Sequence, residues 1–195
     1  GGQRPIFVVG MPRSGSTLTE QILVTADGTE AAGESGFFPW LLLDLARRRY
    51  GEPPYPDIAL MLDAADVARL RADYLDLVSR VFTSAPVVVD KQLTNWKYLG
   101  LLRLIFPEAR FVHTVRNPLD TCLSTYQQCF STLGYGHSLE HLALELRDQA
   151  RVMDHWKSLF PEAIHTLEYE RLVADPDSEI RALYAHCGLP WTDRA

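Results

Sequence analysis

The sequence predicts an α/β fold in which a parallel sheet is covered by helices on both faces. Short apolar stretches alternate with helical patterns along the chain, and the first stretch runs directly into a glycine-bracketed turn and a helix. With 195 residues, of which 47% are hydrophobic, the chain can bury one sizeable core. We therefore expect a P-loop-type three-layer fold with a central parallel sheet flanked by helices, formed as a single domain over residues 1–195.

Each element follows from its local pattern. Apolar runs predict strands at 6–9, 30–33, 86–90, 110–115 and 163–168. Helical periodicity predicts helices at 17–25, 37–49, 64–83, 95–106, 118–130, 139–159 and 178–187. One glycine and three prolines break the segment 50–57, so a surface loop is expected there, and the two glycines within 134–137 predict a second, flexible loop.

Composition excludes several classes of function. The net charge is −6 and there is no basic run, which argues against nucleic acid as a partner. Cys122, Cys129 and Cys187 lack the spacing of a zinc site or a disulfide framework, which fits a reducing compartment. No apolar run approaches the length of about 18 residues that a membrane helix needs, and no signal peptide is present. We expect a cytoplasmic protein without a membrane partner, and, because the chain opens directly on a strand, a catalytic domain from a longer protein.

The most informative segment is the loop from Gly10 to Thr17. A loop between a strand and a helix binds phosphate through its backbone N–H groups and the helix N-terminus. Gly10 and Gly15 have the spacing of a Walker A loop, but Ser16 stands where that loop has its lysine. Arg13 supplies a cation instead. The loop therefore predicts a phosphate site and argues against the chemistry of an NTPase.

Polar clusters follow three other predicted strands. Because ligands of open parallel sheets bind beyond the carboxyl ends of the strands, we expect these clusters to surround the loop. Asn117 is placed to cap the next helix, with Pro118 in its first position, and Ser124 lies two turns further along the same face. Arg116 and Ser124 are therefore candidates for a second anion site. The clusters are Gly33-Glu34-Ser35, Asp90-Lys91 and Arg116-Asn117-Pro118.

Together these motifs resemble those of the sulfotransferases that use 3′-phosphoadenosine 5′-phosphosulfate. The run 12–18 is similar to their 5′-phosphosulfate loop, and 115–120 with Ser124 is similar to their 3′-phosphate element. Gly33-Glu34 resembles the segment that carries the base in protein-tyrosine sulfotransferases, and Asp90-Lys91 resembles their strand-end lysine. The likeness runs from about residue 5 to 191, including a late Tyr-Glu-x-Leu stretch at 169–172, and is nearest to protein-tyrosine sulfotransferases and bacterial repeat-linked relatives.

The resemblance implies a role for each of these residues. Glu34 would be the general base for a hydroxyl acceptor, and Lys91 with Arg13 would stabilise the departing phosphate, so that no metal is required. The acceptor would be a peptide tyrosine, a carbohydrate or a small molecule, and no residue selects among them. Family members continue beyond 188–191 into a basic loop that helps to close over the nucleotide, whereas this sequence ends at residue 195. The residues implied to bind the nucleotide are Arg13, Ser14, Gly15, Ser16, Thr17, Arg116, Ser124 and Tyr169.

Two alternative functions remain open at this point. Asp90 after three valines also fits a Walker B strand that holds Mg²⁺, which would make the protein a Mg²⁺-dependent nucleotide phosphotransferase. A non-catalytic nucleotide-binding module fits the same motifs. Plainer interpretations of single residues are Glu34 as a helix cap, Lys91 as an exposed strand end and His113 as a core residue. His137 and His141 are four residues apart but lack a third metal ligand.

Overall fold

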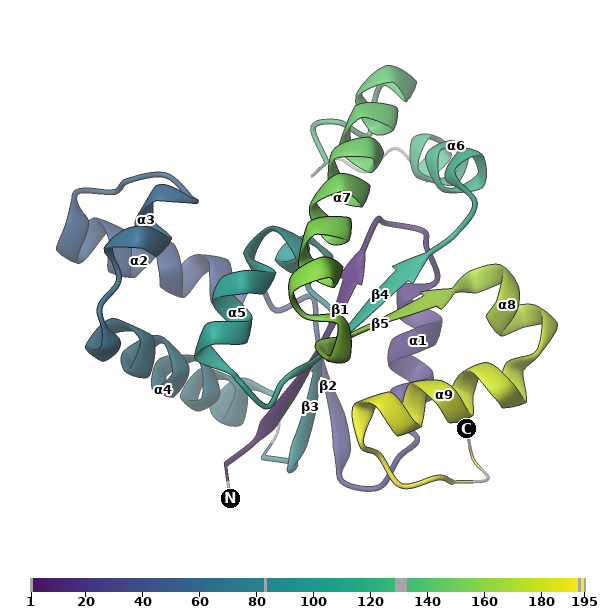
Figure 1. Ribbon diagram of the computed structural model, residues 1–195, viewed down its shortest axis with the longest axis horizontal. Coiled ribbons are helices and arrows are strands. Elements are labelled where there is room, and N and C mark those ends of the chain that lie inside the picture. The colour runs from purple at the N-terminus through teal and green to yellow at the C-terminus, as the bar shows by residue number, and fades with distance from the viewer. Residues whose placement is uncertain (1, 83, 129–132, 193, 195) are drawn as a thin grey trace.

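Strand β1 lies at the centre of a five-stranded parallel sheet with the order β2-β3-β1-β4-β5 (Figure 1). The computed structural model describes residues 2–82, 84–128, 133–192 and 194. The strands are β1 (Arg4–Gly10), β2 (Thr29–Gly33), β3 (Val87–Asp90), β4 (Arg110–Val115) and β5 (Ile164–Glu168). The predicted fold class is confirmed.

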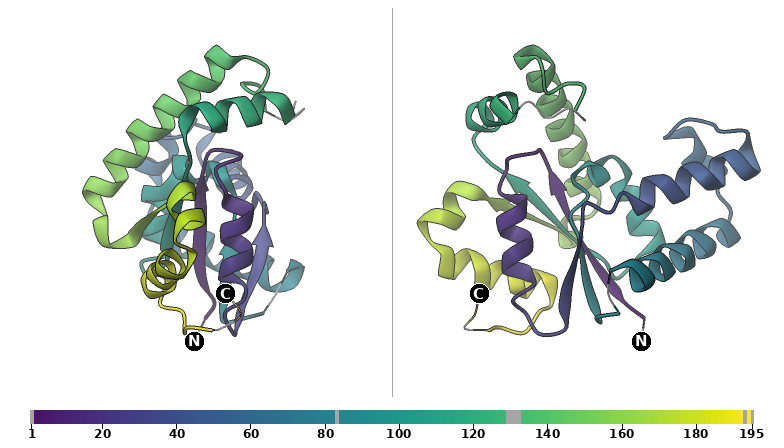
Figure 2. Two further views of the ribbon diagram at one scale, coloured as in Figure 1. Left: turned by 90° about the vertical axis from the view of Figure 1, so that its right-hand side faces the viewer. Right: turned by 180° about the vertical axis from the view of Figure 1, so that it is seen from behind.

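Helices connect the strands and cover the sheet. The described helices are α1 (Ser16–Leu23), α2 (Phe37–Tyr50), α3 (Asp57–Met61), α4 (Ala64–Val81), α5 (Leu99–Ile105), α6 (Pro118–Gln128), α7 (Leu139–Leu159), α8 (Tyr169–Ala174) and α9 (Pro176–Cys187). Two 3₁₀ helices, η1 (Leu93–Tyr98) and η2 (Pro161–Ala163), join them. Figure 2 shows α1 beside α8 and α9, with α2 and α4 on the other side of the molecule. No helix in the described part of the chain has the length and apolar character needed to cross a membrane.

The central strand supplies side chains to two hydrophobic cores, one on each face of the sheet. Ile6 and Val8 pack with residues of α1, α8 and α9. Phe7 and Val9 pack with residues of α2, α4 and α5. All four side chains are fully buried, which is typical of a strand in a parallel sheet covered on both faces. The alternation along β1 therefore fixes the three layers.

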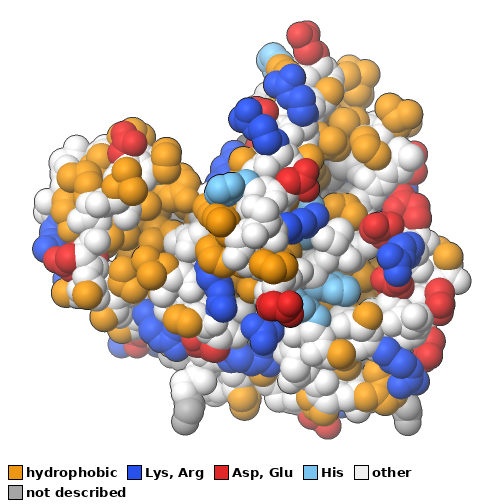
Figure 3. Space-filling view, in the orientation of Figure 1, with side chains coloured by type: hydrophobic (Ala, Val, Ile, Leu, Met, Phe, Trp, Pro, Cys, Tyr) orange, Lys and Arg blue, Asp and Glu red, His pale blue; other side chains and the backbone are white. Residues whose placement is uncertain are grey.

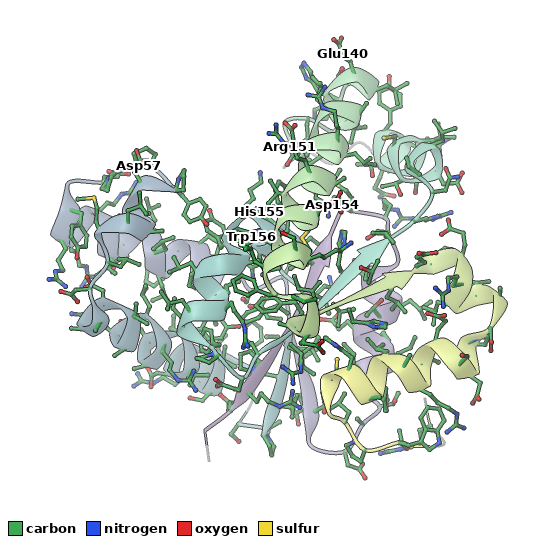
Figure 4. All side chains as sticks on the ribbon, in the orientation of Figure 1. Asp57, Glu140, Arg151, Asp154, His155 and Trp156 are labelled. Carbon is green, nitrogen blue, oxygen red and sulfur yellow. The ribbon has the colours of Figure 1, made fainter. Side chains whose placement is uncertain are left out.

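Long helix α7 rises from the sheet and is attached at its base through Trp156, which is labelled in Figure 4. The indole Nε1 of Trp156 donates a hydrogen bond to the carbonyl of Trp96 at 3.0 Å, and the ring lies against Gly100. This contact fixes η1 beneath α7. Figure 3 shows a deep hollow between α7 and the lobe that carries α2 and α3, with hydrophobic side chains on both of its walls.

Several predicted boundaries are wrong. The segment 95–106 is not one helix, because its first part belongs to the tighter η1, where Asn95 is buried and its amide donates to Asp90. The short helices α3 and α8 were not predicted, since five or six residues are too few to display a helical period. Helix α9 begins two residues earlier than expected, with Asp175 as its cap. The expected ends at Thr83 and at 129–130 lie outside the described residues.

His113 on β4 is a core residue, as its place in the strand predicts. Only 3% of its surface is exposed, and its Nε2 lies 2.8 Å from Nε2 of Gln149 on α7. Burial, together with the smaller effect of the Lys157 charge, lowers the pKa of His113 to about 3. Below the ordinary pKa of 6.5 the unfolded chain therefore binds a proton that the folded protein excludes.

We expect replacement of this histidine to flatten the pH dependence of stability. Between about pH 6 and about pH 4, His113 should make the free energy of unfolding fall by up to about 1.4 kcal/mol for each unit of pH lost. His113→Gln removes this term, so its urea-unfolding curves should show a shallower slope than wild type. His141→Gln, at an exposed position on α7, is the control and should keep the wild-type slope. Equal slopes for all three proteins would contradict a neutral buried His113.

Candidate functional site

A cavity of about 650 Å³ opens at the carboxyl ends of the strands. Its wall is formed by the residues that follow β1, β2, β3, β4 and β5, together with a segment that precedes α7. The polar clusters predicted at the strand ends thus meet at one edge of the sheet. The lining residues are Gly10, Pro12, Arg13, Gly15, Ser16, Thr17, Glu34, Gln92, Leu93, Thr94, Trp96, Arg116, Leu133, Tyr135 and Tyr169.

The loop after β1 presents an open helix N-terminus to this cavity. Helix α1 begins at Ser16, its N-cap is Gly15, and no side chain caps it. The backbone is left-handed at Gly15 (φ 96°) and also at Arg13 (φ 66°), a conformation that is uncommon for residues other than glycine. No acidic residue lies in the first turn of α1. The amide groups at the start of the helix are therefore arranged as in an anion site.

Ser14 has a different place in this loop from its neighbours. Its hydroxyl lies 2.6 Å from the carbonyl of Met11, to which it donates, and 2.7 Å from the hydroxyl of Thr114 on β4. The side chain is buried and does not line the cavity. The group that Ser14 can still offer to an anion is its backbone N–H, whereas Ser16 and Thr17 themselves line the cavity.

Arg13 connects the loop to the second predicted anion element. Its Nε donates a hydrogen bond of 2.9 Å to Oγ of Ser124 on α6. The pattern had paired Ser124 with Arg116, but the hydroxyl contacts the cation of the first loop instead. Both elements therefore belong to one site, although 111 residues separate Arg13 from Ser124.

Arg116 lies against an aromatic ring on the far wall. Its guanidinium carbon is 4.7 Å from the ring centre of Tyr169, and its one ion pair in the described part of the chain, to Asp120, is long at 3.8 Å. The ring of Tyr169 also packs on Gly15, where an added Cβ would lie 2.8 Å from a ring carbon. Tyr169 thus joins the two anion elements from the start of α8.

The turn that leads into α6 is held by two side chains. The side-chain oxygen of Asn117 accepts hydrogen bonds from the backbone N–H groups of Leu119 (2.9 Å) and Asp120 (3.3 Å), which is the predicted cap. The Asn117 N–H donates to the carboxylate of Glu170 at 2.8 Å. Glu170 therefore holds Arg116 in place through the adjacent residue Asn117. The sequence alone assigns no role to Glu170.

Glu34 and Lys91 form an ion pair at the cavity. The Lys91 Nζ lies 2.8 Å from a carboxylate oxygen of Glu34. Glu34 lines the cavity, and its side chain is largely exposed, whereas Lys91 is buried beneath it. Two plainer interpretations are thereby wrong. Lys91 is not an exposed strand end. Glu34 does not cap α2, because the first N–H of that helix, from Phe37, donates to the Ser35 hydroxyl at 3.3 Å.

Asp90 is engaged inside the protein. Its carboxylate accepts hydrogen bonds from the hydroxyls of Tyr74 (2.7 Å) and Ser35 (3.1 Å), from the Gln92 N–H (2.8 Å) and, at 3.4 Å, from the Asn95 amide. It is fully buried, and burial raises its pKa. A Walker B aspartate must face the nucleotide, and Asp90 does not line the cavity. The geometry thus disfavours the Mg²⁺-dependent alternative.

Other candidate ligands are scattered. Within the described residues, no group of three or more His, Cys, Asp and Glu side chains could hold a metal ion. His137 and His141 are both exposed, and Cys122 and Cys187 are free thiols. Cys129 lies outside the described residues.

Part of the cavity wall was not predicted. Gln92, Leu93, Thr94 and Trp96 reach it because η1 turns back directly after β3, and Tyr135 reaches it from the segment before α7. The sequence offers one indication of the residues from η1 and the position before it, namely that they come directly after Asp90-Lys91. Burial raises the pKa of Tyr135 to about 12, so its hydroxyl is a neutral donor at physiological pH.

The parallel sheet and the phosphate-type loop after its central strand define a P-loop-type α/β protein. The family model described as the sulfotransferase family matches residues 5–193, and the chain belongs to that family. The predicted resemblance is therefore confirmed.

Two curated proteins and one solved structure illustrate what the chain is similar to. A protein of Aquifex aeolicus (strain VF5) is 41% identical over 98% of this chain and 26% of its own length. Protein-tyrosine sulfotransferase 1 of Danio rerio is 25% identical over 96% of this chain and 54% of its own length. The sulfotransferase domain of the Synechococcus PCC 7002 olefin synthase shares the fold, with a TM-score of 0.68 at 21% identity, covering 98% of this chain and 76% of that domain. The chain thus spans about a quarter of the length of the Aquifex aeolicus protein and about half of the length of the Danio rerio protein.

We predict that the Ser14 hydroxyl stabilises the fold. Ser14→Ala removes the donor to Met11 and the partner of Thr114, both buried, so the free energy of unfolding should fall by about 1–2 kcal/mol. Thr17→Ala, at an exposed position three residues on, should change it by less than about 0.5 kcal/mol. Urea unfolding measures both. Equal stability of Ser14→Ala and wild type would contradict the inward role of this hydroxyl.

Proposed function

We propose that the protein transfers a sulfuryl group from 3′-phosphoadenosine 5′-phosphosulfate to a hydroxyl acceptor. The observation that carries this proposal is the hydrogen bond between Arg13 and Ser124, because it joins the two anion elements in one cavity whose wall also holds Glu34. Membership of the sulfotransferase family supports it. So does mouse SULT7A1, solved with PAP (adenosine 3′,5′-bisphosphate), which shares the fold at a TM-score of 0.56 and 14% identity over 100% of this chain and 62% of its own.

The nucleotide would be held at both of its phosphate ends. The N–H groups of 14–17, the hydroxyls of Ser16 and Thr17, and Arg13 would bind the 5′-phosphosulfate. Arg116 would bind the 3′-phosphate. The Ser124 hydroxyl, which accepts a hydrogen bond from Arg13, would donate its own proton to the same phosphate. Tyr169 lies between the two and offers a flat surface to the nucleoside.

The reaction needs in-line geometry and charge stabilisation more than covalent catalysis, by analogy with phosphoryl transfer. The acceptor oxygen forms a bond to sulfur while the bond from sulfur to the 5′-phosphate oxygen breaks, and its electron pair leaves with the bisphosphate. Glu34 takes the acceptor proton, a contribution typically worth about 10²–10⁴-fold. Arg13 lines the cavity, whereas the Lys91 ammonium approaches it behind Glu34, and both would stabilise the charge on the departing phosphate. These cations belong to the chain itself, so we propose that no metal is required.

The proposed acceptor is a hydroxyl group on a peptide, a carbohydrate or a small molecule. The test of the proposal is calorimetry without metal, in which adenosine 3′,5′-bisphosphate should bind at least about tenfold more tightly than AMP. No preference, or ATP binding that appears only with Mg²⁺, would overturn the proposal in favour of a phosphotransferase. Preferential binding without transfer to any of a panel of tyrosine peptides, sugars, phenols and aliphatic alcohols would favour a non-catalytic module.

We predict that Arg116→Ala selectively weakens binding of the 3′-phosphate. Its dissociation constant for adenosine 3′,5′-bisphosphate should rise about 10- to 100-fold, because a charge-assisted contact is lost, while that for AMP should hardly change. Calorimetry with both ligands measures the difference. Arg151→Ala, on the exposed side of α7 (Figure 4), should leave both values unchanged. Parallel losses for the two nucleotides would remove Arg116 from the 3′-site.

We predict that Glu34→Gln blocks transfer but not nucleotide binding. Transfer of radiolabelled sulfate to an active acceptor should fall by about 10²–10⁴-fold, because the proton acceptor is lost. The dissociation constant of adenosine 3′,5′-bisphosphate should stay within about threefold of wild type. Glu30→Gln, at an exposed position of β2, is the matched control for removal of one carboxylate. A similar loss in binding and in transfer would assign Glu34 a structural role.

A further inference from the structure

Glu20 is a buried carboxyl beside the site that the proposed function leaves unused. It lies on α1, one turn after the loop that opens the helix, and only 6% of its surface is exposed. Within the described residues its Oε1 has no hydrogen-bond partner. Burial raises the pKa of Glu20. A carboxyl in this setting is costly to the fold, so its position calls for a physical reason.

The charges that act on Glu20 belong to the catalytic candidates. Lys91 attracts the Glu20 carboxylate, whereas Glu34 and Asp90 repel it. Gly33 at the end of β2 ties Glu20 and Lys91 together, because its N–H is hydrogen-bonded to the Glu20 carboxylate and its carbonyl accepts from the Lys91 backbone N–H at 2.9 Å. Glu20 is therefore held within the electrostatic reach of Lys91 through Gly33, although the ion pair of Lys91 among the described residues is with Glu34.

Lys91 needs more than one counter-charge during the proposed reaction. In the described part of the chain its ammonium donates to Glu34, and Lys91 is only 7% exposed. When Glu34 takes a proton from the acceptor, it no longer neutralises the ammonium, and an uncompensated buried charge is costly. Asp90 is already engaged by four hydrogen-bond donors. Glu20, by contrast, has one carboxylate oxygen that accepts no hydrogen bond among the described residues.

We propose that Glu20 is a positioning residue that acts as the second counter-charge of Lys91. Its carboxylate holds the ammonium at the end of β3 whenever Glu34 is protonated or has turned toward an acceptor. The consequence for turnover rests on the proposed function, whereas the pairing of Glu20 with Lys91 does not.

The test is a set of thermal-unfolding measurements on the protein without ligand. Glu20→Gln and Glu34→Gln each leave one counter-charge in place, so each should lower the melting temperature modestly. The double variant leaves Asp90, which is already engaged by four donors, as the remaining carboxylate that acts on the ammonium, and its melting temperature should fall by about 4 °C more than the sum of the two single effects. Adenosine 3′,5′-bisphosphate supplies a new anion and should restore more stability to the double variant than to wild type.

The decisive comparison repeats these variants in a Lys91→Met background. Without the ammonium the extra loss should disappear, whereas a packing role of Glu20 would persist there. Gln21→Ala, the exposed neighbour on α1, is the matched control and should behave alike in both backgrounds. Additive losses with Lys91 present, or an extra loss that survives Lys91→Met, would overturn the proposal.

A second measurement tests the proposal without the double variant, in case that variant does not fold. Acetylation of Lys91, followed by mass spectrometry at neutral pH, reports how strongly the ammonium is stabilised, because only the neutral amine reacts. Glu20→Gln should raise the rate about twofold or more, since it removes a favourable charge, and Gln21→Ala should not. Unchanged labelling in Glu20→Gln would overturn the pairing. Failure of wild type to bind adenosine 3′,5′-bisphosphate would instead contradict the proposed function and leave the pairing intact.

Discussion

The burial of β1 between two strands and two helical layers is the constraint on which the site depends. At its end, a Cβ added to Gly10 would lie 2.5 Å from the carbonyl of Thr114 on β4, so the chain leaves the sheet without a side chain at that point. The hydroxyls of Ser14 and Thr114 then fasten the loop to the neighbouring strand. With the loop fixed in this way, α1 has to start at the edge of the sheet with its first amides toward the cavity. The geometry of the proposed anion site is thus a consequence of how the central strand is packed.

The partners of the cavity arginines explain how a protein of net charge −6 can present a positive site. Most arginines with a described ion pair face a carboxylate at close range, as Arg47 faces Glu52 at 2.9 Å. Arg13 is held by the neutral hydroxyl of Ser124, and no carboxylate among the described residues pairs with it. Arg116 rests on an aromatic ring, with its carboxylate at 3.8 Å. Neutral partners orient a guanidinium without cancelling its charge, which leaves that charge available to an anion.

The sequence identified those parts of the site that depend on chain order. The loop from Gly10, the strand-end pair Asp90-Lys91 and the cap at Asn117 follow from local patterns, because parallel strands deliver their ends to one edge. Two features depend instead on which elements lie beside the loop in space. The Ser14 hydroxyl turns inward because β4 is next to it, and Arg13 reaches Ser124 because α6 is next to it. Local sequence patterns do not show which elements become neighbours. The same holds for η1, whose tight turn follows from burial of Asn95 rather than from propensity. Glu20 was missed because a carboxyl in a helix is normally solvated.

Three carboxyls share the neighbourhood of Lys91, and their environments separate what each can do. Asp90 is fully buried and saturated with hydrogen-bond donors, so it fixes η1 and the Tyr74 side chain rather than exchanging protons with a ligand. Glu20 is buried with a raised pKa and does not line the cavity, so the effect proposed for it on a ligand runs through Lys91. Glu34 is the one member of this group that lines the cavity. Assignment of acid and base roles by environment, rather than by residue type, therefore favours Glu34 as the proposed acceptor of a proton. The other two carboxyls are then left to support the lysine and the wall behind it.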